Sequence, residues 1–498
     1  MKKGFTLIEI VGVIIVLGII ALIAILAINR TMGQNREDLY AFQIKSIEEG
    51  ARNWIMQNVG EAPEEGRGRI LTLGFLQDNG FVKEDIENPL TREPFPRNLI
   101  VCVRRRNGAL IYSVGDNIAD CGPPTCESCF VFDSATGTIT WYKEGTDGCP
   151  VYVIIPRTIN GVTVINIGPG AFEGSGIIEV VIPNTVVEIG HGAFVSTGLT
   201  NVTIPNSVTT IGEYAFPGLS EVTIPNSVTT IGPRAFSPGN LTNVTIPNSV
   251  TTIGGGAFND NQLPDNQALI FARNADGTED RTTIVSYGGA NRNNVVIPNS
   301  VTTIGRYAFL DNRLTNVTIP NSVTIIGDFA FLGNRLTNLS ISNNVTTIGE
   351  SAFGSNRLTN VTIPNNVISI GNWAFSGNQL TSITIPNNIT TIGDGVFSSN
   401  RLTNVTIPNS VTTIGAVAFH GNLLTNVNIG TGVTSIGQNA FNKTSLWNPS
   451  NPELTTIINR TGRSFNWRAI TGSTSPGTFT FVTGTVTHPD GNITVSAN

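Results

Sequence analysis

The chain has 498 residues, only 13% of them charged, and a formal net charge of −6 at pH 7. That length predicts more than one domain. The weakly acidic balance excludes a broad basic surface of the kind that binds DNA or RNA, so we expect no nucleic acid partner.

An apolar run extends from Phe5 to Ile28, directly behind Lys2 and Lys3. It is longer than the roughly 20 residues that a helix needs to cross the hydrocarbon core of a bilayer. A cleaved secretory signal is the alternative, but its apolar core is shorter and ends at a small-residue cleavage site, whereas Asn29-Arg30-Thr31 follows here. We therefore predict one membrane-spanning helix, with the two lysines on the cytoplasmic side.

Glu9 is the one charged residue within that run, and the segment Gly4-Phe5-Thr6-Leu7-Ile8-Glu9 resembles the prepilin signature of type IV pilins and type II secretion pseudopilins. The resemblance implies cleavage between Gly4 and Phe5 by a prepilin peptidase, followed by N-methylation of Phe5. It also implies that Glu9 pairs with the new amino terminus of a neighbouring subunit, since a carboxylate in lipid is costly until a cation neutralises it. A plain, unprocessed membrane anchor is the alternative.

The helix is expected to continue to about residue 58, because an apolar stripe repeats at three- and four-residue steps in a polar stretch. The members of this stripe are Tyr40, Ile44, Ile47, Ala51 and Trp54. A helix over residues 5–58, half in lipid and half amphipathic, is typical of pilins and offers a head domain a surface to pack on. We place a small pilin-like α/β head at residues 59–148, with a hairpin formed by Leu99–Val103 and Ala109–Tyr112.

The five cysteines of the chain lie in or beside this head, at Cys102, Cys121, Cys126, Cys129 and Cys149. Structural disulfides are typical of a chain outside the cytoplasm. The spacing of Cys126 and Cys129 also occurs in zinc knuckles and in thioredoxin-like redox sites, but no second pair, nearby histidines or βαβ pattern accompanies it. We expect disulfides, no metal and no other cofactor.

From about residue 149 the string LTNVTIPNSVTTIG recurs with small changes, and a phenylalanine follows each copy. Most of these phenylalanines lie 22 residues apart. Twelve units are visible, marked by Phe172, Phe194, Phe216, Phe236, Phe258, Phe309, Phe331, Phe353, Phe375, Phe397, Phe419 and Phe441.

The pattern within one unit, Leu314–Asn334, predicts its local structure. Val317-Thr318-Ile319 alternates as a half-buried strand does, and a proline ends it. Val323–Ile326 is a second short strand, Gly327 allows the bend after it, and Ala330-Phe331 fill the interior. One unit buries too little apolar surface to offset the loss of chain entropy, so the units must stack into a solenoid.

These landmarks resemble the BspA-like class of leucine-rich repeats, which occurs on microbial surface proteins. The resemblance covers residues 149–445 and implies a β-solenoid of about twelve coils. In the longer interval between Phe258 and Phe309, the stretches Ala268–Arg273 and Arg281–Tyr287 flank Asp276-Gly277, which predicts a hairpin inserted at residues 259–297. Residues 446–498 lose the period, and we expect them to form a C-terminal cap over the end of the solenoid.

Stacked coils place equivalent residues in columns, and one column consists of Arg313, Arg335, Arg357 and Arg401. Like charges about 5 Å apart in water repel by roughly 0.8 kcal/mol. The arginines therefore either form a linear site for an anionic ligand, such as an acidic glycan, or meet the nearby carboxylates of Asp311, Asp328, Glu350 and Asp394. A second column of threonines is either ordinary strand surface or a regular lattice for polysaccharide or ice.

No catalytic motif or cluster of histidines stands out, so we expect no enzyme. The sequence predicts an α+β multidomain protein: a minor or tip pilin that moves from the bacterial cytoplasmic membrane to the cell surface, where its repeats bind a glycan or protein. The partners implied by the resemblance are prepilin peptidase, the membrane, and other pilin-like subunits bound through the N-terminal helix. A pseudopilin of a type II secretion or DNA-uptake system, whose repeats engage cargo, is the alternative.

Overall fold

The structure is a computed structural model that describes residues 36–58, 68–89, 91–95, 99–106, 109–115, 125–143, 149–442, 456–459 and 465. The chain divides into two compact units, Met1–Cys126 and Glu127–Asn498. Gly4, Phe5, Glu9 and the predicted membrane-spanning run lie outside the described residues. Among the residues described, no helix combines the length and the apolar character needed to cross a membrane.

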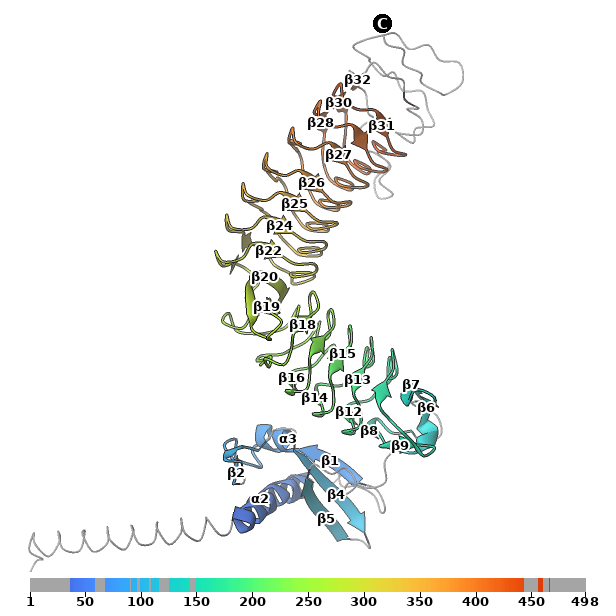
Figure 1. Cartoon of the computed structure of the whole chain (residues 1–498), viewed down its shortest axis with the longest axis vertical. Helices are drawn as coiled ribbons and strands as arrows, with labels where there is room; N and C mark the ends of the chain where they lie inside the picture. Colours follow the sequence, from blue (N-terminus) through green and yellow to red (C-terminus); the bar gives the residue numbers. More distant parts are fainter. Residues whose placement is uncertain are drawn as a thin grey trace, which may run out of the picture. The chain divides into compact units, whose positions relative to one another are not determined.

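The first unit combines one long helix with a small antiparallel sheet (Figure 1). Helix α2 spans Arg36–Gln57, and the sheet has the order β1 (Gly68–Thr72), β4 (Ile100–Arg106), β5 (Ala109–Gly115). The short helix α3 (Leu73–Asp78) follows β1, and β2 (Glu87–Asn88) pairs with β3 (Glu93–Pro94). The predicted hairpin is confirmed by the antiparallel pairing of β4 with β5.

The apolar stripe of α2 supplies the core of this unit, as its periodicity predicts. Ile47, Ala51 and Trp54 are at most 6% exposed, and they belong to one apolar cluster with Val101 and Val103 of β4. Burial of one face on a sheet stabilises a helix that is otherwise polar. The helix and sheet define a small α/β unit, and its pilin character remains an inference from the N-terminal motif.

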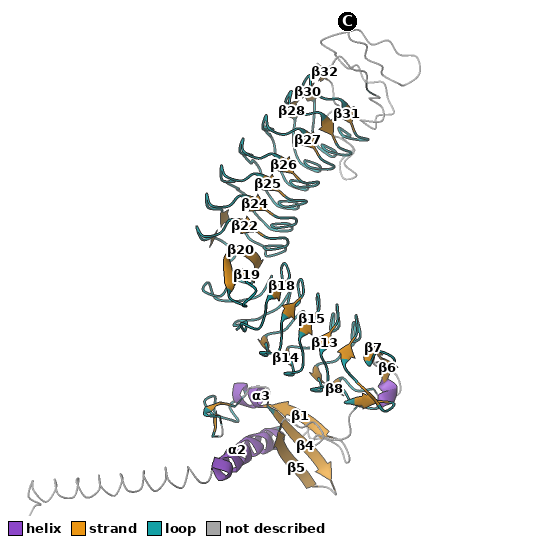
Figure 2. Ribbon diagram, viewed as in Figure 1, coloured by secondary structure: helices purple, strands orange, loops and turns teal. Residues whose placement is uncertain are grey.

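The second unit is a solenoid in which most coils contribute very short strands joined by turns (Figures 1 and 2). The strands form two columns, here named the Val-Thr column and the Thr-Ile column after their commonest residues. Neighbouring strands within a column are parallel and in register; for example, Ile304 pairs with Ile326, and Ile326 with Ile348. The prediction of a β-solenoid of about twelve coils is confirmed.

The strands of the Val-Thr column are β8 (Tyr152–Ile154), β12 (Glu179–Val181), β14 (Asn201–Thr203), β16 (Glu221–Thr223), β21 (Val295–Val296), β23 (Val317–Thr318), β28 (Asn404–Ile407), β30 (Asn426–Ile429) and β32 (Thr456–Asn459). The strands of the Thr-Ile column begin with β7 (Thr138–Tyr142), β11 (Asn166–Ile167), β13 (Glu188–Ile189), β15 (Thr210–Ile211), β17 (Thr230–Ile231) and β18 (Thr252–Ile253). That column continues through β20 (Glu279–Tyr287), β22 (Thr303–Ile304), β24 (Ile325–Ile326), β25 (Thr347–Ile348), β26 (Ser369–Ile370), β27 (Thr391–Ile392), β29 (Thr413–Ile414) and β31 (Ser435–Ile436). A separate small ribbon pairs β9 (Thr158–Ile159) with β10 (Val162–Thr163).

Stacked aromatic rings run through the interior of the solenoid. The twelve repeat phenylalanines are each at most 2% exposed. The rings of Phe309 and Phe331 have centroids 4.8 Å apart and planes inclined by 8°, and Phe331 and Phe353 stack at 5.3 Å. Each coil contributes one ring to this stack, so residues at equivalent surface positions of successive coils repeat at about the same spacing as the rings.

The solenoid begins before the boundary at residue 148 that the sequence suggests. β6 (Phe130–Asp133) and β7 form a hairpin, and β7 pairs in parallel with β11 at the start of the Thr-Ile column. The ring of Tyr142 lies 5.3 Å from that of Phe172, in the place of a repeat phenylalanine. Residues that the sequence assigned to the head thus form the N-terminal cap of the repeats.

The expectation of structural disulfides is confirmed. Cys129, the last residue of a short 3-10 helix in the cap (Glu127–Cys129), is bonded to Cys149. Cys102 on β4 is disulfide-bonded as well. Because Cys129 is already bonded, the Cys126-x-x-Cys129 spacing does not provide a dithiol or a zinc ligand pair.

The inserted segment is a hairpin, as predicted, and it forms an incomplete coil. β19 (Leu269–Arg273) pairs with β20, and the end of β20 continues the Thr-Ile column by pairing with β22. On the opposite turn, Asn259 Nδ2 donates to the carbonyl oxygens of Tyr307 and Leu310 at 2.7 and 3.0 Å, so the coils before and after the insertion touch directly there. The insertion is therefore a wedge that fills one side of the stack only.

The Val-Thr column extends beyond residue 445, because β32 pairs in parallel with β30. The remainder of the predicted C-terminal cap lies outside the described residues, apart from residue 465.

Candidate ligand-binding surface of the repeats

A ladder of buried asparagines holds the turn that follows each repeat phenylalanine from Phe258 to Phe419. Asn334 Nδ2 donates to the carbonyl oxygens of Phe309 and Phe331 at 2.7 and 3.0 Å, and its Oδ1 accepts the Leu314 N–H at 2.9 Å. The side chain thus joins two coils and satisfies backbone groups that would otherwise be buried without partners. Equivalent bonds are made by Asn261, Asn356, Asn378, Asn400 and Asn422.

The predicted arginine column lies directly after these asparagines, where Arg313, Arg335, Arg357 and Arg401 are all exposed. The backbone N–H of Arg335 donates to Leu314 O at 2.8 Å, and that of Arg357 donates to Leu336 O at 3.0 Å. Neighbouring coils therefore hold the arginine backbones in line, at about the 4.8 Å spacing of paired strands.

One arginine of the column is neutralised and three are not. Arg313 Nη2 lies 2.9 Å from Asp260 Oδ2. Among the residues that the structure describes, no carboxylate lies within 4.0 Å of the side chains of Arg335, Arg357 or Arg401. These three residues, hereafter the open arginine column, keep their positive charge on one line of the surface.

Three of the four acids expected to meet the arginines, Asp311, Asp328 and Asp394, have other partners, and the Glu350 carboxylate lies beyond 4.0 Å from the arginine side chains of the described residues. Asp311 pairs with Arg234 at 3.4 Å, and burial raises the pKa of the Asp311 carboxyl although Arg234 opposes that shift. Asp328 Oδ1 accepts the Glu350 N–H at 2.9 Å. Asp394 Oδ1 likewise accepts a backbone N–H of the following coil, at 2.6 Å. Asp328 and Asp394 thus bond to the backbone of the following coil and not to the arginines.

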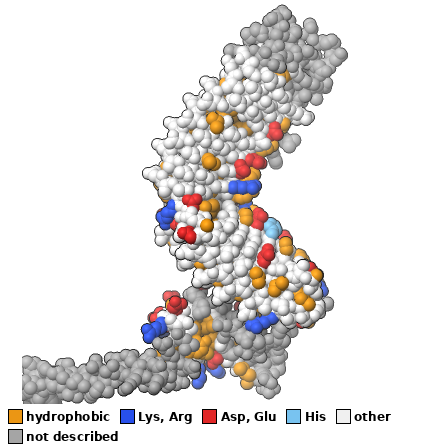
Figure 3. All heavy atoms as spheres, in the orientation of Figure 1, with side chains coloured by type: hydrophobic (Ala, Val, Ile, Leu, Met, Phe, Trp, Pro, Cys, Tyr) orange, Lys and Arg blue, Asp and Glu red, His pale blue; other side chains and the backbone are white. Residues whose placement is uncertain are grey.

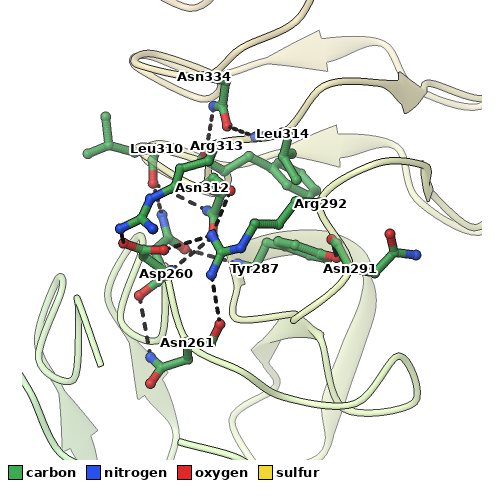
Figure 4. A network of polar contacts seen from close by, with 12 residues as sticks. Asp260, Asn261, Tyr287, Asn291, Arg292, Leu310, Asn312, Arg313, Leu314 and Asn334 are labelled. Atoms are coloured by element: carbon green, nitrogen blue, oxygen red, sulfur yellow. Dashed lines mark hydrogen bonds and ion pairs between the residues drawn. The ribbon is translucent and has the colours of Figure 1, made fainter. Parts of the chain in front are cut away.

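A polar cluster at the inserted coil explains why Arg313 differs (Figure 4). The carboxylate of Asp260, whose side chain is 12% exposed, also lies 2.7 Å from Arg292 Nη1. Arg292 donates in addition to the carbonyl oxygens of Asn312 at 2.9 Å and Asn261 at 3.2 Å. Arg313 therefore belongs to a clamp that fastens the coils on either side of the insertion, and this contact occupies its charge.

The repeats otherwise carry little charge. In the space-filling view most of the described surface is neutral and polar, and the acidic and basic side chains gather around the middle coils (Figure 3). The predicted threonine column is a part of this neutral surface, with exposed side chains at Thr223, Thr245, Thr318, Thr362, Thr384 and Thr406.

The inserted hairpin also lines a groove of about 560 Å³ with the preceding coil. Val244, Ile246, Arg273 and Glu279 are among its lining residues. Arg273 closes part of it by donating to the Gly277 carbonyl oxygen at 3.0 Å. The groove is broad and open, and its walls mix apolar and charged groups.

The histidines do not come together in the described part of the chain. His191 Nδ1 lies 3.5 Å from Glu213 Oε2, and burial lowers the pKa of His420 on a distant coil. No group of three or more histidine, cysteine, aspartate or glutamate side chains within the described ranges is placed to hold a metal ion.

A sequence model of the BspA type leucine-rich repeat region matches the chain over residues 154–264, 285–401 and 347–468. The matched segments cover more than half of the chain, which therefore belongs to this family. The unmatched residues 265–284 correspond to the inserted hairpin.

Several solved structures are similar to the chain. A leucine-rich repeat protein from Bacteroides ovatus is 25% identical, with 72% of this chain and 98% of that chain covered and a TM-score of 0.38. A leucine rich cell surface protein from Faecalibacterium prausnitzii is 23% identical, with coverages of 70% and 96% and a TM-score of 0.36. The pneumococcal vaccine antigen PcpA is 19% identical, with coverages of 73% and 86% and a TM-score of 0.34. No curated protein matches the sequence.

Proposed function

We propose that the protein is a non-enzymatic binding protein, displayed at the cell surface, whose solenoid binds an acidic glycan along the open arginine column. The observation that supports this most is the line of Arg335, Arg357 and Arg401, which meet no carboxylate among the residues that the structure describes. A polymer whose negative charges repeat along its length gains several contacts at once, since each bound group raises the effective concentration of the next.

We further propose that the chain reaches the surface as a pilin-like subunit. The motif Gly4–Glu9 supports this, as does the amphipathic helix α2 packed beneath a small sheet. A solenoid of this size is bulky for a subunit packed along a whole fibre, which favours a minor or tip position. If the protein instead stays at a secretion or DNA-uptake machine, the pseudopilin alternative holds and the repeats engage cargo.

The glycan proposal is tested by exchanging Arg335, Arg357 and Arg401 for glutamine together in the full-length chain. Glutamine suits the fold here, because Gln379 occupies the same column. Each exposed ion pair contributes up to about 1 kcal/mol, so loss of all three should weaken binding to immobilised heparin or hyaluronan about tenfold or more. Binding of the unaltered chain should also fall as salt rises.

The matched control changes three exposed cations elsewhere, Lys83, Arg92 and Arg157, to glutamine. This variant has the same net charge as the first but an intact column, and it should bind as the unaltered chain does. Equal binding by both variants would refute the arginine column as the site. If the arginines were needed to capture an acidic protein and the chain bound neither glycan, the ligand of the column would be a protein and not a glycan.

A further inference from the structure

A different surface column has a composition that the fold does not require. It is formed by the second residue after each repeat glycine, and its backbone has positive φ, for example 62° at Tyr307, 56° at Phe329 and 61° at Trp373. The cause is a ladder between coils: Phe329 N–H donates to Glu350 O at 2.7 Å, and Trp373 N–H to Asp394 O at 2.8 Å. The backbone N–H at this position must point along the stack to reach the carbonyl oxygen of the next coil. The left-handed backbone conformation directs it there.

Glycine is the residue that this conformation favours. Four coils have it, at Gly170, Gly192, Gly256 and Gly395, with φ between 59° and 70°. Four other coils place a large aromatic ring in the column instead, at Tyr214, Tyr307, Phe329 and Trp373. A bulky residue at positive φ is strained, and strained residues concentrate where a ligand is bound. The backbone conformation of the column therefore gives no reason for these rings.

The best-placed ring is that of Trp373. It lies over Gly395 of the next coil, where an added Cβ would fall 2.2 Å from Trp373 Cε3. The coil therefore covers one face of the indole, while Trp373 as a whole remains 39% exposed. A flat ring with a backed face and an open face is the geometry on which a pyranose ring stacks.

The column continues toward the inserted coil. In four successive coils this column holds Phe329, Ser351, Trp373 and Gly395, so a large side chain alternates with a small one. The two large members are two coils apart, or about 10 Å at the spacing of paired strands. That separation is close to the length of a disaccharide unit in an extended glycan, whose alternate sugars present the same face.

Phe329 is in turn stacked on Tyr307, with centroids 5.2 Å apart, and Arg306 lies 4.6 Å from the Tyr307 ring centroid. The neighbouring column supplies hydrogen-bonding groups beside the rings. Exposed Glu350, Asn372 and Asp394 lie there, next to the small and large positions. Two of these three are acidic, which disfavours a polyanion.

We propose that Tyr307, Phe329 and Trp373 form a binding surface for a neutral linear polysaccharide. Sugar rings stack on the aromatic side chains, and sugar hydroxyls bond to the polar groups beside them. The inference deepens the proposed binding role of the repeats, but it depends neither on the open arginine column nor on the pilin-like N-terminus. A protein partner fits less well, because protein interfaces have a desolvated apolar centre and this line of rings is narrow and has polar borders.

The test is native gel electrophoresis of the full-length chain through gels that contain hydroxyethylcellulose, galactomannan or glycol chitin. At least one of these should retard the unaltered chain. Trp373→Gly and Phe329→Gly should each weaken that retardation tenfold or more. Ser351→Gly is the matched control, since it makes the same backbone change in the same column without removing a ring, and it should behave as the unaltered chain does.

Glycine or serine already occupies this column in other coils, so the variants should fold; thermal unfolding checks this, and Phe329→Ser is a second form of the same test. The proposal is overturned if no gel retards the chain, or if folded Trp373→Gly is retarded fully. It is also overturned if Trp373 is needed only for capture of a peptide. Heparin binding by these variants reports separately on the arginine column, so the two proposals fail independently.

Discussion

At the scale of single residues, buried polar side chains determine how the turns of the solenoid are held. Asn356 is 6% exposed and serves four backbone groups, the carbonyl oxygens of Phe331, Phe353 and Gly354 and the N–H of Leu336. Each is a group that water cannot reach once the coils stack. An asparagine three residues after each repeat phenylalanine from Phe258 to Phe419 was visible in the sequence. Asparagine is usually a surface residue, however, so its periodicity alone did not separate it from its exposed neighbours.

We predict that Asn356→Ala destabilises the repeats by at least about 2 kcal/mol, because it leaves buried donors and acceptors unpaired. Urea unfolding followed by circular dichroism measures the change. Asn360→Ala, at an exposed asparagine in the same coil, is the control and should change the unfolding free energy by less than about 0.5 kcal/mol. Similar behaviour of the two variants would mean that the ladder contributes little.

Asp260 is a second residue whose role depends on burial. We predict that Asp260→Asn costs about 2–4 kcal/mol, because Arg292 is then left largely buried without its counterion. Glu279→Gln removes the exposed contact with Arg281 at 2.9 Å and should cost less than about 1 kcal/mol. Thermal unfolding of the two variants compares them, and a smaller loss for Asp260→Asn would contradict the clamp.

At the scale of elements, the hairpins were the most predictable parts. Alternating apolar residues around a turn predicted β4–β5 and β19–β20, and both pair as expected. The hairpin β6–β7 was missed because it lacks the repeat consensus, although it pairs with the first repeat strand. The sequence did not show that the insertion at residues 259–297 fills only one side of the stack. The Arg313–Asp260 contact beside it joins residues too distant in sequence to be paired from a pattern.

The inserted hairpin yields a prediction about pH. Thr278 Oγ1 donates to Asp276 Oδ1 at 2.6 Å, and Thr282 Oγ1 donates to Asp280 Oδ1 at 2.6 Å. These side-chain bonds, with backbone bonds from the same threonines, hold the pKa of both carboxyls below the ordinary 3.8. Since the folded pKa is lower than the unfolded one, the stabilisation is present above the unfolded pKa and is lost as pH falls through the folded pKa.

NMR titration of the side-chain carboxyl carbons measures both groups at once. Thr278→Val should raise the pKa of Asp276 toward its ordinary value and leave that of Asp280 low, so that Asp280 serves as the internal control. An unchanged Asp276 pKa in this variant would show that the threonine hydroxyl does not cause the shift.

At the scale of the whole molecule, two kinds of inference combine. The repeat period predicted a stacked solenoid because one unit cannot stabilise itself, and family membership and the stacked core agree with that reasoning. The proposal that the chain is processed, assembled and displayed as a pilin-like subunit rests on the prepilin-like motif of the sequence. The repeat period predicted which arginines share a column. Only the contacts around each side chain show that Arg313 is neutralised by a carboxylate and that the three arginines of the open arginine column are not.

The most direct measurement for the whole account is mass spectrometry of the N-terminal peptide from chains sheared off the cell surface. We predict a mature chain that begins at Phe5 and carries one methyl group on its amino nitrogen, recovered in the fibre fraction. Chains that retain Met1–Gly4, or that are absent from the surface, would contradict the claim that a pilin-type N-terminus displays these repeats.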